Sequence, residues 1–308
     1  MARYIIRRLM FVVFSMVGAT LVAFLAMQLA PGDPLQLMAG STNIPPEVME
    51  AWRHRYGLDR PLLVQYLVFL KNALRLDFGT SYHYIGKPVT EILAQGIPVT
   101  VKWQAVGLLV AIGGAVPMGV ISALKQNSWI DNLFMLFALL GASLPSFALA
   151  TFLIVVVSLR LGWLPVAGLS TPRHYILPAL AMAAGPAALL ARMMRASMLE
   201  TIGQDYIRTA RAKGLGERRV VTRHALRNAM LPTLTIVGVI VGRMLSGSFL
   251  VETIFNIPGL GRIGVTAVLQ RDYPVILGTT ILLAAVFMLV TMITDILYAF
   301  LDPRIRFD

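Results

Sequence analysis

Six long runs of apolar residues, separated by polar stretches, set the pattern of this chain. The runs cover Leu9–Ala30, Trp103–Leu124, Asn132–Leu159, His174–Ala191, Ala229–Val251 and Tyr273–Thr294. An α-helix rises about 1.5 Å per residue, so about 20 residues cross the hydrocarbon core of a bilayer. Backbone groups in lipid must be hydrogen-bonded internally, which favours helices here. The pattern therefore predicts an all-α integral membrane protein with six transmembrane helices.

The longest polar stretch follows the first run and covers residues 31–97. Pro46 opens a predicted helix that ends before Gly57, and a second helix with an apolar face begins after Pro61. We expect this segment to form a helical extracytoplasmic cap that rests on the membrane or on the spans. It is too small to be an independent domain.

Composition supports the membrane assignment and narrows the partners. The chain is 57% hydrophobic and 14% charged, whereas soluble domains carry about 25% charged residues. Its formal net charge is +12, but the basic residues lie between apolar runs and form no continuous basic face, so we expect no nucleic acid as a partner. Anionic lipid and a protein partner explain the positive balance better.

The distribution of Lys and Arg around the runs indicates an orientation with the N-terminus in the cytoplasm. Outside the basic loop described next, the inside positions are Arg3, Arg7, Arg8, Lys125, Arg192, Arg195, Arg304 and Arg306. Six spans return the C-terminus to the cytoplasm. Residues 1–30 then form the N-terminus and first helix, 98–301 a core domain with five spans and a cytoplasmic loop at 201–228, and 302–308 a cytoplasmic tail.

The longest basic segment runs from Arg208 to Pro232. Its basic residues are Arg208, Arg211, Lys213, Arg218, Arg219, Arg223 and Arg227. Gly214 and Gly216 interrupt the middle, which predicts a helix, a glycine turn and a second helix. In a regular helix Arg219, Arg223 and Arg227 share one face. A short helix lying across a membrane surface can carry force to another subunit; a solvated basic loop that only sets topology is the alternative.

This segment resembles the EAA loop of binding-protein-dependent ABC importers. Arg208, Thr209 and Ala210 occupy the positions of the Glu-Ala-Ala triplet, and Gly214 occupies that of the glycine. Arg208 replaces the usual acid, and the proline comes late, at Pro232. The variant TARAKG…HALRNAMLP is similar to the dipeptide/oligopeptide permease branch. The same branch is indicated by VETIFNIPGLG at Val251–Gly261, RDYPVI at Arg271–Ile276 and LDPRIR at Leu301–Arg306.

The resemblance implies a type I ABC importer permease fold in the plasma (inner) membrane of a bacterium or archaeon. It implies three kinds of partner: a homologous second permease, two cytoplasmic ATPases that bind ATP and Mg²⁺, and an extracytoplasmic substrate-binding protein. The loop would be a coupling helix that docks on an ATPase. The candidate coupling residues are Arg208, Thr209, Ala210, Gly214, Arg219, Arg223, His224, Arg227 and Asn228. Substrates of the branch are dipeptides, oligopeptides, glutathione or nickel complexes.

Catalytic and cofactor motifs are missing from the sequence. It contains no Gly-x-x-x-x-Gly-Lys-Ser/Thr motif, so we expect no ATP bound through a P-loop. Its four histidines are scattered, which leaves no zinc-protease motif. We therefore expect no enzyme activity, metal or cofactor in this chain. An ATP-independent channel or solute carrier is the alternative function, and dependence of uptake on ATP discriminates the two.

Arg243 is the one charge well inside an apolar run. A charged side chain at the centre of a membrane helix costs about 2.5–3.5 kcal/mol on insertion scales. Its neighbours Gly242 and Ser246 are small, which favours a position on the wall of the translocation pathway. Snorkelling of the guanidinium to the membrane surface is the alternative.

Overall fold

The computed structural model describes residues 2–29, 35, 45–55, 57–84, 86–246 and 249–301. Within these ranges the regular structure is helical, and the β pairing is limited to an isolated bridge between Thr80 and Pro88. Among the described residues, five helical segments are long and apolar enough to cross a membrane. They are Ile6–Leu29, Val89–Leu124, Pro172–Ile202, Glu217–Gly242 and Tyr273–Thr294.

The third apolar run is a bent pair rather than one straight helix. Helix α6 (Trp129–Ser143) ends before Pro145, and α7 (Ser146–Leu153) continues into the π-helix η1 (Ile154–Arg160) at 107° to α6. Leu144 is extended, with φ −89° and ψ 125°, because a residue that precedes proline disfavours the helical region. The six predicted spans thus correspond to five helices and one bent pair.

Several helices extend beyond the apolar runs that predicted them. Helix α5 (Val89–Leu124) starts before its run, α8 (Ile176–Ile202) continues past its run, and residues from Glu217 onward are already helical before α11 (Leu226–Ser246). Hydropathy marks the stretch that suits lipid, whereas a helix can continue into water with polar side chains. The boundaries of these three helices therefore shifted, although each was predicted as a span.

The chain divides into two compact units. The first contains residues 1–100 and 258–288, and the second contains residues 101–257 and 289–308. Helices α5 and α14 (Tyr273–Leu301) contribute to both units.

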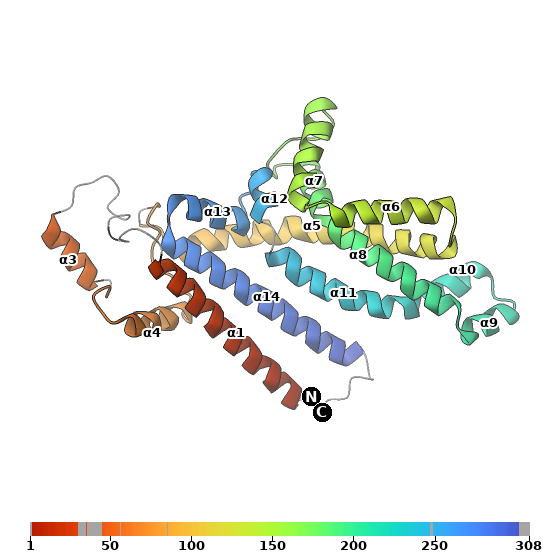
Figure 1. Ribbon diagram of the computed structural model, residues 1–308, viewed down its shortest axis with the longest axis horizontal. Helices are drawn as coiled ribbons and strands as arrows, with labels where there is room; N and C mark the ends of the chain where they lie inside the picture. The colour runs from red at the N-terminus through yellow and green to blue at the C-terminus, as the bar shows by residue number, and fades with distance from the viewer. Residues whose placement is uncertain are drawn as a thin grey trace. The chain divides into compact units, whose positions relative to one another are not determined.

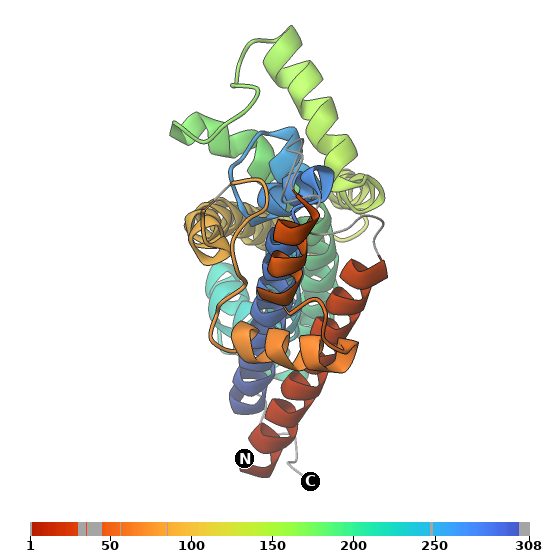
Figure 2. The same cartoon turned by 90° about the vertical axis from the view of Figure 1, so that its left-hand side faces the viewer.

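The first unit holds α1 (Ala2–Leu29) and the two predicted cap helices, α3 (Pro46–Arg55) and α4 (Leu62–Ala73). Helix α4 crosses α1 (Figure 2), where the Tyr66 hydroxyl lies 3.1 Å from Thr20 Oγ1 and donates to the Val17 carbonyl at 3.2 Å. The ring of Phe24 packs against those of Tyr66 and Phe69, with centroids 5.5 and 5.8 Å apart. Aromatic packing and two polar contacts therefore fasten the cap helix to the first span.

A buried carboxylate holds the cap segment at residues 81–83. Asp272, just before α14, accepts hydrogen bonds from the Ser81 hydroxyl and from the backbone N–H groups of Tyr82 (3.1 Å) and His83 (3.3 Å). In the same unit, the Leu260 N–H at the start of α13 (Leu260–Gln270) donates to Thr100 Oγ1 at 2.8 Å. These side chains satisfy backbone donors that helix ends and turns leave open.

The second unit is built around α8, which lies between α6 and α11 (Figure 1). Glycines allow the close approaches: a Cβ on Gly119 would lie 2.6 Å from the Ala191 carbonyl oxygen, and one on Gly141 would lie 2.9 Å from that of Ala184. Small residues at such crossings bring helix backbones into contact, as is usual in membrane bundles. Helix α12 (Phe249–Ile254) also belongs to this unit, with Glu252 buried and hydrogen-bonded by Trp103 Nε1 at 3.0 Å.

Candidate coupling site

The basic segment forms the predicted helix, glycine turn and second helix. Helix α9 (Asp205–Ala212) follows the end of α8 after a short break at Gly203 and Gln204. After the turn, α10 (Glu217–Arg219), the π-helix η3 (Val220–Ala225) and α11 follow one another without interruption. The second helix of the segment is therefore the leading end of a long apolar helix and not a separate element.

The turn after α9 is a Schellman motif centred on Gly214. Its φ of +76° lies in the left-handed region, which glycine adopts without strain. The Gly214 N–H donates to the Arg211 carbonyl at 2.9 Å, and the Leu215 N–H donates to that of Ala210 at 3.4 Å. Leu215 packs against the buried cluster that contains Ala210, so the turn has a fixed direction.

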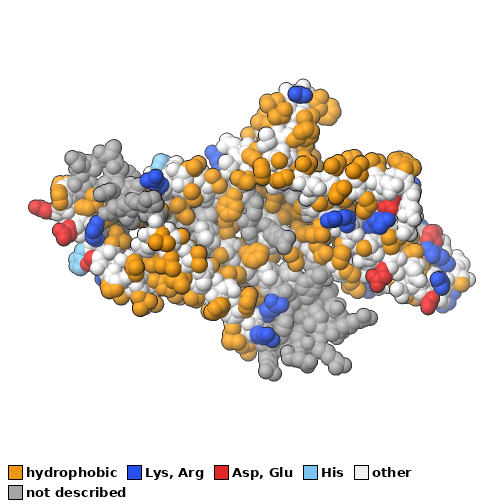
Figure 3. Space-filling view, viewed as in Figure 1, with side chains coloured by type: hydrophobic (Ala, Val, Ile, Leu, Met, Phe, Trp, Pro, Cys, Tyr) orange, Lys and Arg blue, Asp and Glu red, His pale blue; other side chains and the backbone are white. Residues whose placement is uncertain are grey.

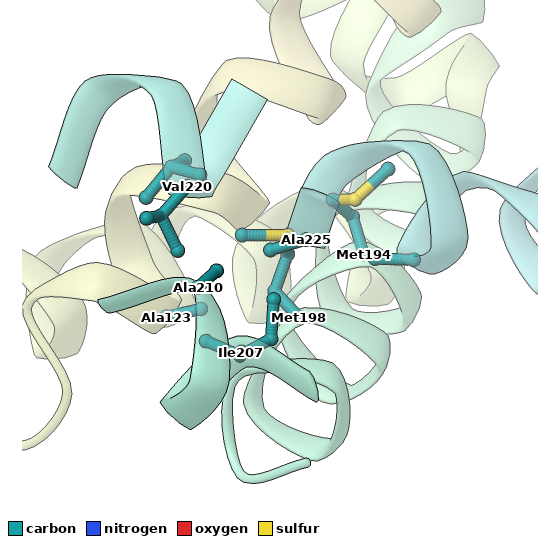
Figure 4. Packing of buried hydrophobic residues seen from close by; sticks show 9 residues of the cluster. Ala123, Met194, Met198, Ile207, Ala210, Val220 and Ala225 are labelled. Atoms are coloured by element: carbon teal, nitrogen blue, oxygen red, sulfur yellow. The ribbon is translucent and has the colours of Figure 1, made fainter. Parts of the chain in front are cut away.

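Helix α9 is seated by its apolar side. Ile207 and Ala210 are buried three residues apart, whereas Arg208 and Thr209 between them are exposed. They belong to a hydrophobic group that we call the loop cluster (Figure 4). Its buried members are Ala123, Met194, Met198, Ile207, Ala210, Val220, Val221, Ala225 and Ala229. The cluster joins α9 to α5, α8 and the start of α11.

The π-helix η3 explains how adjacent valines can both reach this cluster. Val220 and Val221 are both buried, and Ala225 is fully buried five and four residues later. The wider turn of a π-helix, with bonds from residue i to i+5, brings residues five apart onto one side. One such bond joins the Leu226 N–H to the Val221 carbonyl.

The polar side of the segment is basic and exposed. Charged side chains gather over α9 and α10 (Figure 3), and Arg219, Arg223 and Arg227 are all exposed. Because η3 intervenes, their four-residue spacing does not keep a strict row along the helix. Arg218, Arg219, Thr222 and Arg223, with Gly216 and Glu217, line a shallow surface hollow of ≈ 580 Å³.

Polar contacts across the turn complete the geometry. Arg211 donates from Nε and Nη2 to the two oxygens of Glu217 at 3.1 and 2.6 Å, and this carboxylate raises the pKa of the Arg211 guanidinium. Asn228 donates to the Tyr206 hydroxyl at 2.8 Å and to the His224 carbonyl at 3.2 Å. The Arg211–Glu217 ion pair and the Asn228–Tyr206 hydrogen bond tie α9 to the chain that follows the turn.

The structure thus brings the nine candidate loop residues into one helical corner, and their role in coupling stays a prediction, as does the pathway role of Arg243 and Ser246. The side chains of Arg243 and Ser246 lie outside those that the structure describes. The sequence analysis did not predict that Met194 and Met198 of α8 pack against α9. Their i, i+4 spacing next to Arg192 was a signal for a buried helix face. The Tyr206–Asn228 contact had no such signal, because the residues are 22 positions apart.

Long apolar helices, with a short amphipathic helix between two of them, define an integral membrane protein. The chain belongs to the family of binding-protein-dependent transport system inner membrane components. The model of that family matches residues 115–307, and the model of the N-terminal part of these membrane components matches residues 1–103.

Relatives span the whole chain. It is 40% identical over 306 residues to the dipeptide transport system permease protein DppB of Bacillus subtilis (strain 168), covering 99% of this chain and 98% of the relative. It is 41% identical to the oligopeptide transport system permease protein AppB of the same organism and to the glutathione transport system permease protein GsiC of Escherichia coli (strain K12), covering all of each chain.

Solved structures share the fold at low sequence identity. The methionine ABC transporter MetNI in inward-facing conformations matches with a TM-score of 0.56 at 20% identity, over 68% of this chain and 96% of that one. An amino acid ABC transporter with histidines matches with a TM-score of 0.51 at 19% identity, over 70% and 95% of the two chains. The fold is therefore the type I ABC importer permease fold, and the protein is a permease subunit of the inner membrane. The family favours an ATP-driven importer over a channel.

Proposed function

We propose that this chain forms half of the translocation pathway of a peptide importer, paired with a homologous second permease. Two cytoplasmic ATPases would bind ATP and Mg²⁺, and an extracytoplasmic binding protein would deliver the substrate. The names of the relatives, which cover dipeptide, oligopeptide and glutathione transport, support a short peptide as the substrate. The chain itself would catalyse no reaction. Both termini and the 201–228 loop would face the cytoplasm, and residues 31–97 would face outward.

The packing of the apolar side of α9 against the loop cluster is the observation that carries this proposal. Its buried side contacts the loop cluster, so a push on its exposed side reaches α5 through Ala123 and α8 through Met194 and Met198. The same push reaches α11 directly, because α10 and η3 continue into it. A loop that only set topology would need neither a buried face nor a fixed turn. Helix α9 is therefore the coupling helix of the proposal.

The exposed arginines would meet acids on the ATPase. Arg219, Arg223 and Arg227 stand on the side of the segment that the loop cluster leaves open. A guanidinium binds carboxylates through two parallel hydrogen bonds, which suits a specific protein contact. Anionic lipid is the alternative partner for this face, and it would bind any arrangement of the same charges.

The test is reconstitution of the complete complex in liposomes. The permease pair is purified with its ATPases, the binding protein is added outside, and uptake of labelled dipeptides, oligopeptides and glutathione is measured with and without internal ATP. We expect copurification of the ATPases and uptake of at least one peptide class that stops without ATP. Uptake that continues without ATP, or a permease that retains no ATPase, would contradict the proposal.

The assignment of Arg243 and Ser246 to the pathway stays a prediction from sequence. The variant Arg243→Met keeps an unbranched apolar stem and removes the charge. We expect lower uptake by a complex that still assembles and hydrolyses ATP, because an anionic group of the substrate or of the partner permease loses its partner. Unchanged uptake of every delivered substrate would leave snorkelling as the explanation.

A further inference from the structure

A partly buried ion pair lies within the second unit, outside the loop itself. Arg195 of α8 donates from Nε to Asp131 Oδ1 and from Nη2 to Oδ2, both at 2.7 Å. Asp131 of α6 is only 1% exposed. The same carboxylate accepts the hydroxyl of Ser122 on α5 and the N–H of Asn127 at 2.9 Å. One side chain thus binds α5, the α5–α6 turn and α8 together.

The local sequence explains why the carboxylate stands at this point. Asn127 takes a φ of +62° in the tight turn after α5, a conformation that Asn tolerates better than most residues. Ser128 caps α6 by accepting the Asp131 N–H at 3.3 Å, which places the acid in the first turn of the helix. Two carboxylate oxygens offer about four acceptor positions, so the four donors fill them.

The Asp131 carboxylate connects α8 and α5, and in each helix the residue that binds it is next in sequence to a member of the loop cluster. Arg195 follows Met194 on α8, and Met198 lies three residues later; both methionines are fully buried beneath α9. Ser122 precedes Ala123, the member of the cluster on α5. The two helices that form the floor under α9 are therefore the two that the Asp131 carboxylate connects.

We propose that Asp131 and Arg195 are positioning residues for energy coupling, which rests on the proposed function of α9. The pair makes the α5–α6 hairpin and α8 one mechanical body, so that a displacement of α9 moves them together. Apolar side chains such as those of the loop cluster resist separation but allow sliding, as in shear motions of packed helices. A bidentate pair fixes direction as well as distance. Without the pair, only the apolar contact at Ala123 would link α9 to the hairpin, and the hairpin could slide against α8 when α9 moves.

The variant that tests this idea removes the tie and keeps the packing. Asp131→Leu combined with Arg195→Met and Ser122→Ala removes all three side chains of the network, and the Asn127 N–H, in the exposed turn, is the donor that loses its acceptor. Replacement of a buried ion pair by apolar residues of similar volume is often neutral for folding. Arg192→Met is the matched control, because Arg192 is exposed on the same helix one turn earlier. The readout is the number of substrate molecules imported per ATP hydrolysed by the reconstituted complex.

We expect the triple variant to assemble with an unchanged melting temperature and to import at least about fivefold fewer molecules per ATP, the lower end of a typical coupling between sites. The Arg192→Met complex should match the wild type. A triple variant with the wild-type ratio would overturn the positioning role and leave the proposed function intact. A wild-type complex without ATP-dependent uptake would instead remove the proposed function.

A distance measurement keeps the proposal open to refutation if the triple variant does not assemble. The chain has no cysteine, so spin labels can be placed at Lys125→Cys, after α5, and at Ala212→Cys, on α9. Both positions are exposed. In the otherwise wild-type complex we expect the same distance distribution in the nucleotide-free and the ATP-trapped states. A shift between the two states would show that α9 and the hairpin move separately, which overturns the proposal.

Discussion

The cap and the coupling loop are both short helical segments outside the apolar runs, yet they are held by different means. Hydrogen bonds from defined partners, beside the packing of the Phe24 ring on α4, hold the cap. Tyr66 bonds to the first span, and Asp272 binds the backbone at Tyr82 and His83. An apolar seat holds the loop, and its charged side chains remain exposed. Directional hydrogen bonds fix one geometry. An amphipathic helix that packs by its apolar side can transmit a force applied to its exposed side. The difference agrees with a structural attachment in the cap and with the proposed docking role of the loop.

The largest effect on docking of the ATPase is expected from a charge placed in the loop cluster beneath α9. In Ile207→Asp a carboxylate would enter a fully buried apolar site, at a cost of several kcal/mol if it stayed ionised there. We expect α9 to leave the loop cluster and the complex to lose most of its ATPase in a pull-down, while the chain still inserts into the membrane. Ala212→Asp, which adds the same charge at an exposed position of α9, should retain the ATPase. Equal retention of the ATPase by both variants would contradict the packing of α9 on the loop cluster as the basis of docking.

A smaller effect is expected from the exposed arginines. Replacement of Arg219, Arg223 and Arg227 by Gln keeps the loop cluster intact and removes three positive charges. Exposed ion pairs contribute about 0–1 kcal/mol each, so we expect retention of the ATPases in a pull-down to fall several-fold and to become more sensitive to salt. Unchanged retention at moderate salt would mean that this face binds anionic lipid instead.

The smallest effect on coupling is expected from the cap anchor. Asp272→Asn leaves one acceptor oxygen for the groups that donate to the carboxylate, which should cost about 1–3 kcal/mol locally. We expect faster hydrogen exchange at residues 81–84 and unchanged retention of the ATPases. Loss of ATPase retention in this variant would contradict the division between a structural cap and a docking loop.

The sequence predicted most elements because their signals are local. Apolar runs located the spans, and Gly214 and Gly216 located the turn between two helices. The break at Leu144 was not predicted, because a proline in an apolar run is compatible with a kink as well as with a break. The seat of α9 and the partners of Asp131 depend on side chains far apart in the chain, such as Ala123, Met198 and Arg195. No local pattern specifies such contacts.

The most direct test of the coupling role compares two prolines in the turn. Gly214 has a φ of +76° and donates its N–H to the Arg211 carbonyl. Proline can do neither, because its φ is fixed at about −65° and it has no backbone N–H. Gly216 has a φ of −59° and open space where a side chain would start, so proline fits there. The measurement is the stimulation of ATP hydrolysis by the substrate-loaded binding protein in the reconstituted complex. We predict that Gly214→Pro abolishes the stimulation and that Gly216→Pro preserves it; wild-type stimulation with Gly214→Pro would contradict the account.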